Sequence, residues 1–162
     1  MILQTILLIA GIAALIGALV LMMMPRWQAA ALAFAGLLML HWSYYIAVRP
    51  SYLVFWGVAA AMVTGIGYMS PRGEIDGNRM SNVYLGAAAL AGALLGMIVG
   101  ARFMVLGVIL GTIVGQIAYM RTPAGRWLRE SRATAVRYFM AKGLPALVTM
   151  AIMGVAIEGF IR

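Results

Sequence analysis

The chain has 162 residues, of which 65% are hydrophobic and only 10% are charged, with a formal net charge of +8 and a mean hydropathy of +1.00. Soluble domains are nearer half apolar and about a quarter charged, so this composition excludes an ordinary water-soluble domain and predicts an integral membrane protein. The absence of cysteine excludes disulfides, thiol nucleophiles and thiolate metal sites. Cytoplasmic loops beside anionic lipid explain the positive charge better than nucleic acid does, so no nucleic-acid partner is expected.

Apolar runs of near-spanning length follow one another and predict one all-α membrane domain over residues 1–162, a bundle of about six transmembrane helices. The first run is expected to be retained rather than cleaved, because no basic segment precedes it and Pro25-Arg26-Trp27 follows it. Residues 83–120 are too long for one span at about 1.5 Å per residue and are expected to form a hairpin that turns at Gly100-Ala101-Arg102. A re-entrant pair that never crosses fully is the alternative. The expected spans are about 2–24, 28–48, 51–69, 83–101, 103–120 and 143–161.

Lys and Arg are unevenly divided between the two ends of these spans, and this asymmetry predicts an orientation. In a six-span arrangement nine of them share one side: Arg26, Arg72, Arg79, Arg121, Arg126, Arg129, Arg132, Arg137 and Lys142. The other side holds Arg49, Arg102 and Arg162. Cytoplasmic loops carry the excess of Lys and Arg, so we expect the larger group in the cytoplasm and both termini outside it. The expected location is a cell membrane, crossed several times, with the bacterial inner membrane favoured.

Small residues recur at every fourth position in three of the spans, which places each set on one helix face. The three rows are Ala88, Gly92, Gly96 and Gly100; Gly107, Gly111 and Gly115; and Gly57, Ala61 and Gly65. In lipid, a face without side chains lets two backbones approach and gain dispersion contacts and weak Cα–H···O bonds. Tight packing, a glycine zipper, is favoured over a pore or switch lined by small residues. The hairpin legs are expected to pack on each other or on another subunit.

Residues 77–125 resemble the glycine-rich core of an uncharacterised bacterial membrane-protein family, domain of unknown function 456. The resemblance consists of a Gly–Ser segment, an even glycine row, a short turn and a second row written roughly LGxxLGxxxG. The matching positions are Gly77, Ser81, Gly86, Gly92, Gly96, Gly100, Gly107, Gly111 and Gly115. The chain departs from the family at Pro25-Arg26-Trp27, where a Pro-Gly-rich turn is common, and at Gln116, where an acidic residue is common. The resemblance implies a helical membrane protein, and it carries over no functional residue.

The segment 121–142 is strongly basic and is expected to contain an interfacial amphipathic helix over about 123–139. Thr122 is expected to cap this helix, with Pro123 at its first position. The cations expected to meet anionic lipid headgroups are Arg121, Arg126, Arg129, Arg132, Arg137 and Lys142. A topological anchor is favoured over specific docking of a lipid or a partner protein.

Titratable side chains are few, and none is clustered with a base. His41, the only histidine, is expected to be neutral and hydrogen-bonded to a neighbouring helix. Glu158 is expected to reach the headgroups or pair with Arg162; a proton-relay role is the alternative if it faces the bundle interior. With no Cys, one His and four carboxylates, the chain is not expected to be an enzyme, and no catalytic residue, metal site or cofactor is expected.

Two classes of function remain open from the sequence. The first is a structural, assembly or lipid-organising membrane component that acts through tightly packed glycine-zipper helices. Its partners would be the bilayer, anionic lipid headgroups, and a second copy of the chain or another membrane protein. The second is a small channel or carrier whose path is formed or gated by the 83–120 hairpin. The first is favoured, because carriers normally show more ionisable or polar residues at mid-membrane than this chain has.

Overall fold

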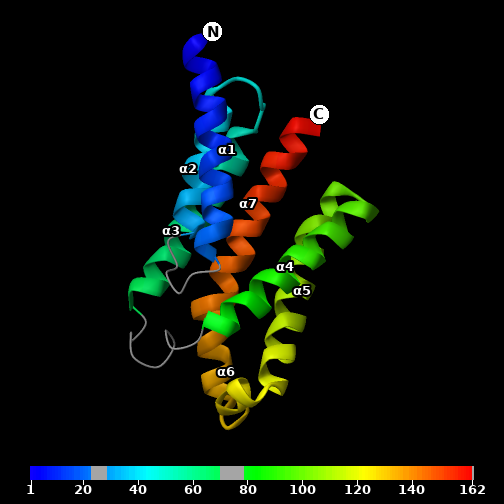
Figure 1. The fold of residues 1–162 in the computed structure, drawn as a ribbon. Helices are drawn as coiled ribbons and strands as arrows, with labels where there is room; N and C mark the ends of the chain where they lie inside the picture. The colour runs from blue at the N-terminus through cyan, green and yellow to red at the C-terminus, as the bar shows by residue number, and fades with distance from the viewer. Residues whose placement is uncertain (23–28, 70–78, 162) are drawn as a thin grey trace.

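The structure is a computed structural model that describes residues 1–22, 29–69 and 79–161, with the backbone alone for 79–82 and 101–102. The expected features at 25–27, 70–78 and Arg162 lie outside these residues. Within the described ranges all regular secondary structure is helical, which confirms the all-α class (Figure 1). The elements are α1 (Ile2–Met22), α2 (Ala29–Trp42), α3 (Pro50–Met69), α4 (Arg79–Val99), α5 (Ala101–Arg121), the 3₁₀ helix η1 (Pro123–Arg129), α6 (Arg132–Tyr138), the π-helical η2 (Phe139–Gly143) and α7 (Leu144–Ile161).

Among the described residues, four helices are long and apolar enough to cross a membrane, where the sequence predicts about six. They are Ile2–Met22, Pro50–Met69, Phe103–Arg121 and the continuous run Arg132–Ile161. Two further helices are apolar but shorter, Ala29–Trp42 and Val83–Val99. Several membrane-compatible helices are thus established, and this supports a membrane protein.

Helix α2 is shorter than the span 28–48 that hydropathy predicts, because the chain leaves the helix after Trp42. Ser43 Oγ donates a hydrogen bond to the Leu40 carbonyl at 2.6 Å, and Tyr44 has a φ of 62°, which no α-helix tolerates. The 14 residues of α2 cover only about 21 Å at 1.5 Å per residue. Residues 43–49 are therefore chain without helical structure, in which Ile46, Ala47 and Val48 extend the apolar run, and hydropathy alone does not show where the helix ends.

The basic segment also differs from the single interfacial helix expected over 123–139. Thr122 does cap a helix, accepting a hydrogen bond from the Gly125 N–H at 3.2 Å, but that helix is 3₁₀ and ends at Arg129. After Glu130 and Ser131 a new helix begins and continues through η2 into α7. The π turn ends two residues before Pro145, whose ring would clash with the Ala141 carbonyl in a regular α-helix. The second half of the basic segment is thus the first part of the last long helix.

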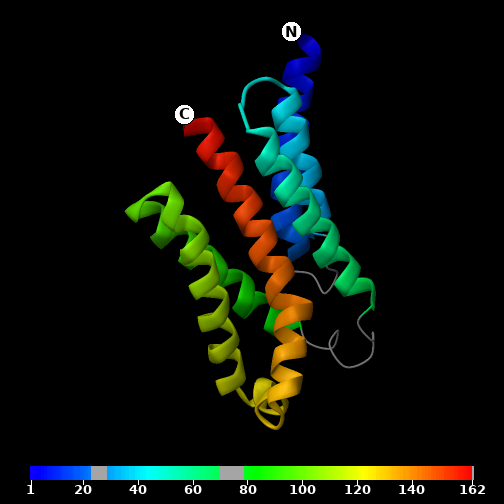
Figure 2. The ribbon, with the colours of Figure 1, turned by 180° about the vertical axis from the view of Figure 1, so that it is seen from behind.

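Helix α7 is the centre of the bundle, in contact with α1, α2, α3, α4 and α5. Helices α1–α3 lie on one side of it, and the α4–α5 pair lies on the other (Figures 1 and 2). The sequence suits this position, because α7 buries small and medium side chains on most of its faces. Residues 2 and 161 lie at one end of the bundle with the 43–49 segment, and η1 and α6 lie at the opposite end.

Candidate functional site

The two glycine rows of α4 and α5 face each other across an antiparallel hairpin. The hairpin turns at one residue, Gly100, within the turn expected at 100–102: α4 ends at Val99 and α5 begins at Ala101. Gly100 has a φ of 156°, in the positive range that L side chains rarely adopt. Glycine at this position lets the chain reverse without a connecting loop, so the two legs are held close from their first turn onward.

The backbones of α4 and α5 touch along the hairpin. A Cβ added to Gly92 would strike the Gly107 carbonyl oxygen, and a Cβ added to Gly107 would strike that of Gly92. A Cβ on Gly96 would lie 2.8 Å from Met104 Cα and would also strike the Phe103 carbonyl oxygen. A Cβ on Gly111 would strike the Ala88 carbonyl oxygen and lie 3.0 Å from Ala88 C. Each of these glycines therefore occupies a place that no other residue can fill without moving a helix.

The end of the contact away from the Gly100 turn is also tightly packed. A Cβ on Gly115 would lie 2.8 Å from the Tyr84 carbonyl oxygen, and Gly86 is buried. Outside these rows, the hairpin adds four buried side chains to a hydrophobic cluster that it shares with α7: Ala89, Ala93, Met104 and Val108. On α7, Gly154 lies against the thioether of Met104. The hairpin is thus closely packed within itself and docked on the central helix through its other buried side chains.

The third small-residue row, in α3, does not form such a contact along its length. Gly57 lies against the Phe34 ring, with a Cβ position 2.8 Å from Phe34 Cζ. Ala61 is exposed, and a Cβ on Gly65 would meet no atom within 4 Å. The spacing of four is the same as in α4 and α5, but only the first position meets a neighbouring helix. Ala61 and Gly65 therefore lie on a face of α3 that has no close neighbour among the described residues, while Val63 and Gly67 in the same stretch are buried on another face. A packing role for Ala61 and Gly65 stays a prediction.

A glycine pair that the spacing rule missed joins α1 to α2. Gly11 and Gly36 are both buried, and the Cβ position of each lies 3.0 Å from the carbonyl oxygen of the other. Neither belongs to a row of glycines spaced by four. The available signal was the series of small residues on one side of α2, where Ala29, Ala33 and Gly36 are all buried.

The basic residues gather at the end of the bundle formed by η1 and α6. Four arginines are exposed, and in the described part of the chain their side chains make no hydrogen bond or ion pair: Arg121, Arg126, Arg132 and Arg137. Arg129 differs, because its Nε donates a 2.6 Å hydrogen bond to the Met120 carbonyl at the end of α5. Lys142 is half-buried within the π turn. The expected headgroup cations thus differ in how they are held: Arg129 is exposed but bonded to the end of α5, and Lys142 is half-buried.

An aromatic cluster fixes this basic end to the hairpin. Tyr119 and Tyr138 stack with ring centroids 6.0 Å apart, and Trp127 meets Tyr138 edge-on at 5.9 Å. Tyr119 and Tyr138 are the largest fully buried side chains among the described residues. The Gln116 amide adds a 3.0 Å hydrogen bond from α5 to the Ala135 carbonyl in α6. The arginines of η1 and α6 therefore lie on helices that are packed against the end of α5.

Comparisons with protein-family models, curated proteins and solved structures find no match for this chain. What the site can do therefore rests on its geometry. Within the described residues no three His, Cys, Asp or Glu side chains come together as a metal site would require. His41 is half-buried, and its Nδ1 has no hydrogen-bond partner among the described residues, unlike the bond to a neighbouring helix that we expected.

The exposed arginines give a testable expectation for lipid binding. Changing Arg126, Arg132 and Arg137 together to Gln should weaken retention of anionic lipid by about fivefold per residue, since each is worth about 1 kcal/mol near an anionic leaflet. Lipid retained by the purified protein, measured by mass spectrometry, reports the effect. Arg129→Gln is the contrasting variant, because it removes a hydrogen bond within the fold and should lower thermal stability. Unchanged lipid retention and orientation in the triple variant would indicate that this end faces a partner protein.

Proposed function

We propose that the protein is a structural, assembly or lipid-organising component of a membrane, with the α4–α5 hairpin as its rigid part. The observation that carries the proposal is the direct contact between the two helix backbones at Gly92, Gly96, Gly107 and Gly111. Contacts of this kind are how helices associate in lipid, where no hydrophobic force draws them together. A hairpin closed in this way resists bending and presents fixed outer faces to its surroundings.

The same contact disfavours the alternative of a channel or carrier with its path between these two helices. A solute path there would need space for at least a water molecule, and carbonyl oxygens already meet the positions where side chains would begin. Opening the path would require separating the helices along several turns. The outer faces carry apolar side chains such as Leu95, Ile98, Leu110 and Val114, all exposed in the described structure, which suit lipid or another apolar helix.

The number of membrane crossings, the membrane and the orientation belong to the same proposal. We propose six crossings of a cell membrane, most simply a bacterial inner membrane, with the basic end in the cytoplasm. The placement of residues 2 and 161 at the end opposite η1 and α6 supports this arrangement. The relationship to domain of unknown function 456 stays a hypothesis that rests on the glycine pattern of residues 77–125. A second copy or another membrane protein is the proposed partner of the hairpin's outer face.

Orientation is tested by reporter fusions. A reporter that is active only in the cytoplasm should be silent when attached after the last residue and active when inserted after Glu130, which is exposed between η1 and α6. The expected contrast follows from the excess of arginine at the η1–α6 end. Activity of the terminal fusion, with silence of the internal one, would reverse the proposed orientation.

Function is tested with Gly96→Val, read in two assays on the same purified sample. A structural hairpin predicts lower thermal stability in detergent, or loss of an oligomer. A transport path predicts that the assembly keeps its stability while protein-dependent solute flux into liposomes is lost. The second result would favour the channel or carrier and contradict the structural proposal.

A further inference from the structure

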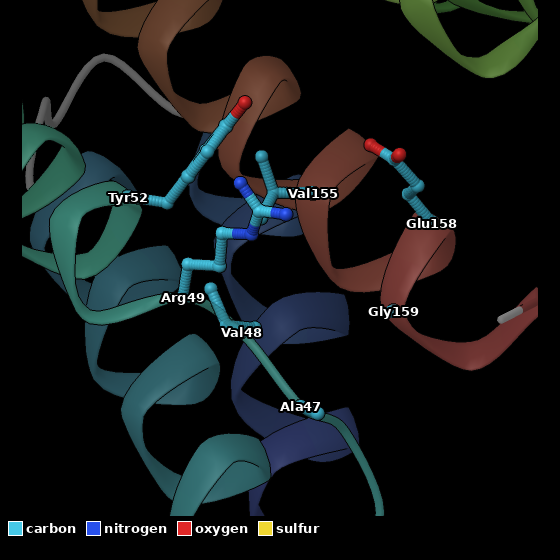
Figure 3. A pocket seen from close by; sticks show the side chains of 7 residues that line it. All are labelled: Ala47, Val48, Arg49, Tyr52, Val155, Glu158 and Gly159. Carbon is cyan, nitrogen blue, oxygen red and sulfur yellow. The ribbon is translucent and has the colours of Figure 1, made fainter.

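At the end of the bundle away from the basic segment lies a pocket of about 310 Å³. It is lined by Ala47, Val48, Arg49, Tyr52, Val155, Glu158 and Gly159 (Figure 3). The 43–49 segment reaches the last turns of α7 here, because Ile46 is buried against Gly159, where any side chain would collide with it. The volume is near the low end of the range of about 300–1,000 Å³ typical of ligand pockets, so it suits a small polar group.

The pocket has opposite charges on its two sides. Arg49 and Tyr52, at the start of α3, supply a guanidinium and a phenolic hydroxyl, and Glu158 supplies a carboxylate from the last turns of α7 (Figure 3). Within the described residues Arg49 makes no ion pair or side-chain hydrogen bond. The helix dipoles add to the same polarity, because α3 begins beside Arg49 and α7 ends beside Glu158. A ligand with an anionic group and a cationic group would align with this field.

The surroundings place the pocket at headgroup level. Trp42, Tyr44, Tyr45 and Tyr52 are all exposed at this end of the bundle, and exposed Trp and Tyr side chains concentrate at membrane–water interfaces. Phe55 and Met62, both exposed, continue the side of α3 that starts at Tyr52, so apolar surface runs from the pocket along a membrane-compatible helix. A lipid with its headgroup in the pocket could lay an acyl chain on this surface.

We propose that this pocket binds the headgroup of a zwitterionic aminophospholipid, with Arg49 and Tyr52 on the phosphate and Glu158 on the primary ammonium. Arginine recognises phosphate through charge-assisted hydrogen bonds, and an ammonium offers N–H donors to a carboxylate. A choline headgroup has no N–H donor, and a glycerol headgroup has no cation, so phosphatidylethanolamine satisfies both sides where these lipids satisfy one. The proposal rests on the membrane placement proposed above, but it uses neither the α4–α5 contact nor the exposed arginines.

Native mass spectrometry of the full chain in detergent, with phosphatidylethanolamine, phosphatidylcholine and phosphatidylglycerol added at equal concentration, tests the proposal. The unmodified chain should prefer phosphatidylethanolamine over phosphatidylcholine. Glu158→Gln should remove that preference while phosphate-dependent binding persists. Arg49→Gln should weaken binding of phosphatidylethanolamine and phosphatidylcholine about tenfold, the effect of losing a hydrogen bond to a charged group. Tyr52→Phe should have a smaller effect in the same direction.

Arg121→Gln is the matched control, because it removes an exposed cation at the opposite end and should leave the preference for ethanolamine unchanged. Thermal stability without added lipid shows whether each variant is folded. If folded Glu158→Gln keeps the preference for phosphatidylethanolamine over phosphatidylcholine, or folded Arg49→Gln binds both lipids as tightly as the unmodified chain does, the proposal is wrong. Displacement of the lipid by an equal concentration of soluble phosphoethanolamine would assign the pocket to a soluble ligand and overturn the lipid assignment. Because none of the residues that line the pocket belongs to α4 or α5, Gly96→Val separates failure of the proposed hairpin role from failure of this site.

Discussion

Replacing Gly96 or Gly111 with Val should destabilise the protein by about 1–3 kcal/mol for each site, because the new side chain must enter space held by a facing backbone. The Cβ alone would strike the Phe103 carbonyl oxygen from Gly96 and the Ala88 carbonyl oxygen from Gly111. A backbone atom cannot rotate away as the end of a flexible side chain can, so the two helices must separate. Thermal unfolding of the purified protein in detergent measures the loss.

Replacing Gly96 or Gly111 with Ala distinguishes what the backbone contact predicts from what is usual for faces of small residues. Faces of small residues usually accept Ala, and the sequence alone predicts a mild effect. The structure predicts a clear loss even for Gly96→Ala and Gly111→Ala, because the colliding atom is the Cβ itself.

Gly65→Val is the matched control for both substitutions. It makes the same change within a membrane-compatible helix, but its Cβ would meet no atom within 4 Å, so stability should stay within about 0.5 kcal/mol. Equal behaviour of Gly65→Val and Gly96→Val would show that the hairpin contact does not stabilise the fold.

Tyr119→Ala should have the largest effect of any single substitution considered, about 3–5 kcal/mol, comparable with truncating other large buried aromatic residues. The Tyr119 ring is fully buried, stacks on Tyr138 and contacts the Tyr84 ring at 6.0 Å between centroids. Its removal leaves a cavity between α5, η1 and α6, so the basic end should loosen first. Trypsin should then cleave at the arginines of 121–132 faster than in the unmodified protein.

Two controls separate ring packing from other effects of Tyr119→Ala. Tyr119→Phe keeps the ring and removes the hydroxyl, which donates a 3.3 Å hydrogen bond to the Ala124 carbonyl, so its effect should stay below about 1.5 kcal/mol. Tyr45→Ala truncates an exposed tyrosine at the other end of the bundle and should leave cleavage at 121–132 unchanged. Cleavage of Tyr119→Ala at the rate of Tyr45→Ala would contradict a structural role for the cluster.

The all-helical class and the hairpin at Gly100 could be predicted because their signals are local. Apolar runs and a glycine at every fourth position are visible within one segment. The end of α2 was harder to place, because residues 43–48 are uncharged and Ile46, Ala47 and Val48 continue the apolar run. In the structure the chain leaves the helix at Ser43 and reaches a positive φ at Tyr44. The π turn at 139–143 likewise depends on the backbone response to Pro145.

Packing partners could not be predicted from one helix at a time. Gly57, Ala61 and Gly65 have the spacing of Gly107, Gly111 and Gly115, but which face meets a neighbour is decided by the whole bundle. The Gly11–Gly36 contact joins two helices with no shared periodicity. Arg49 and Glu158 are more than one hundred positions apart, so the sequence offers no reason to place them in one pocket.

The central position of α7 has a consequence for how the chain assembles during synthesis. Two pairs of neighbours, α1 with α2 and α4 with α5, make their contacts across short sequence separations and can form as soon as each pair has left the ribosome. Helix α7, which contacts both pairs, follows them in the sequence and is therefore synthesised after them. Until α7 arrives, the surfaces that it will cover must be shielded by lipid or a chaperone. A ribosome that pauses before residue 144 would therefore prolong the period in which the two pairs stand apart and are exposed to degradation.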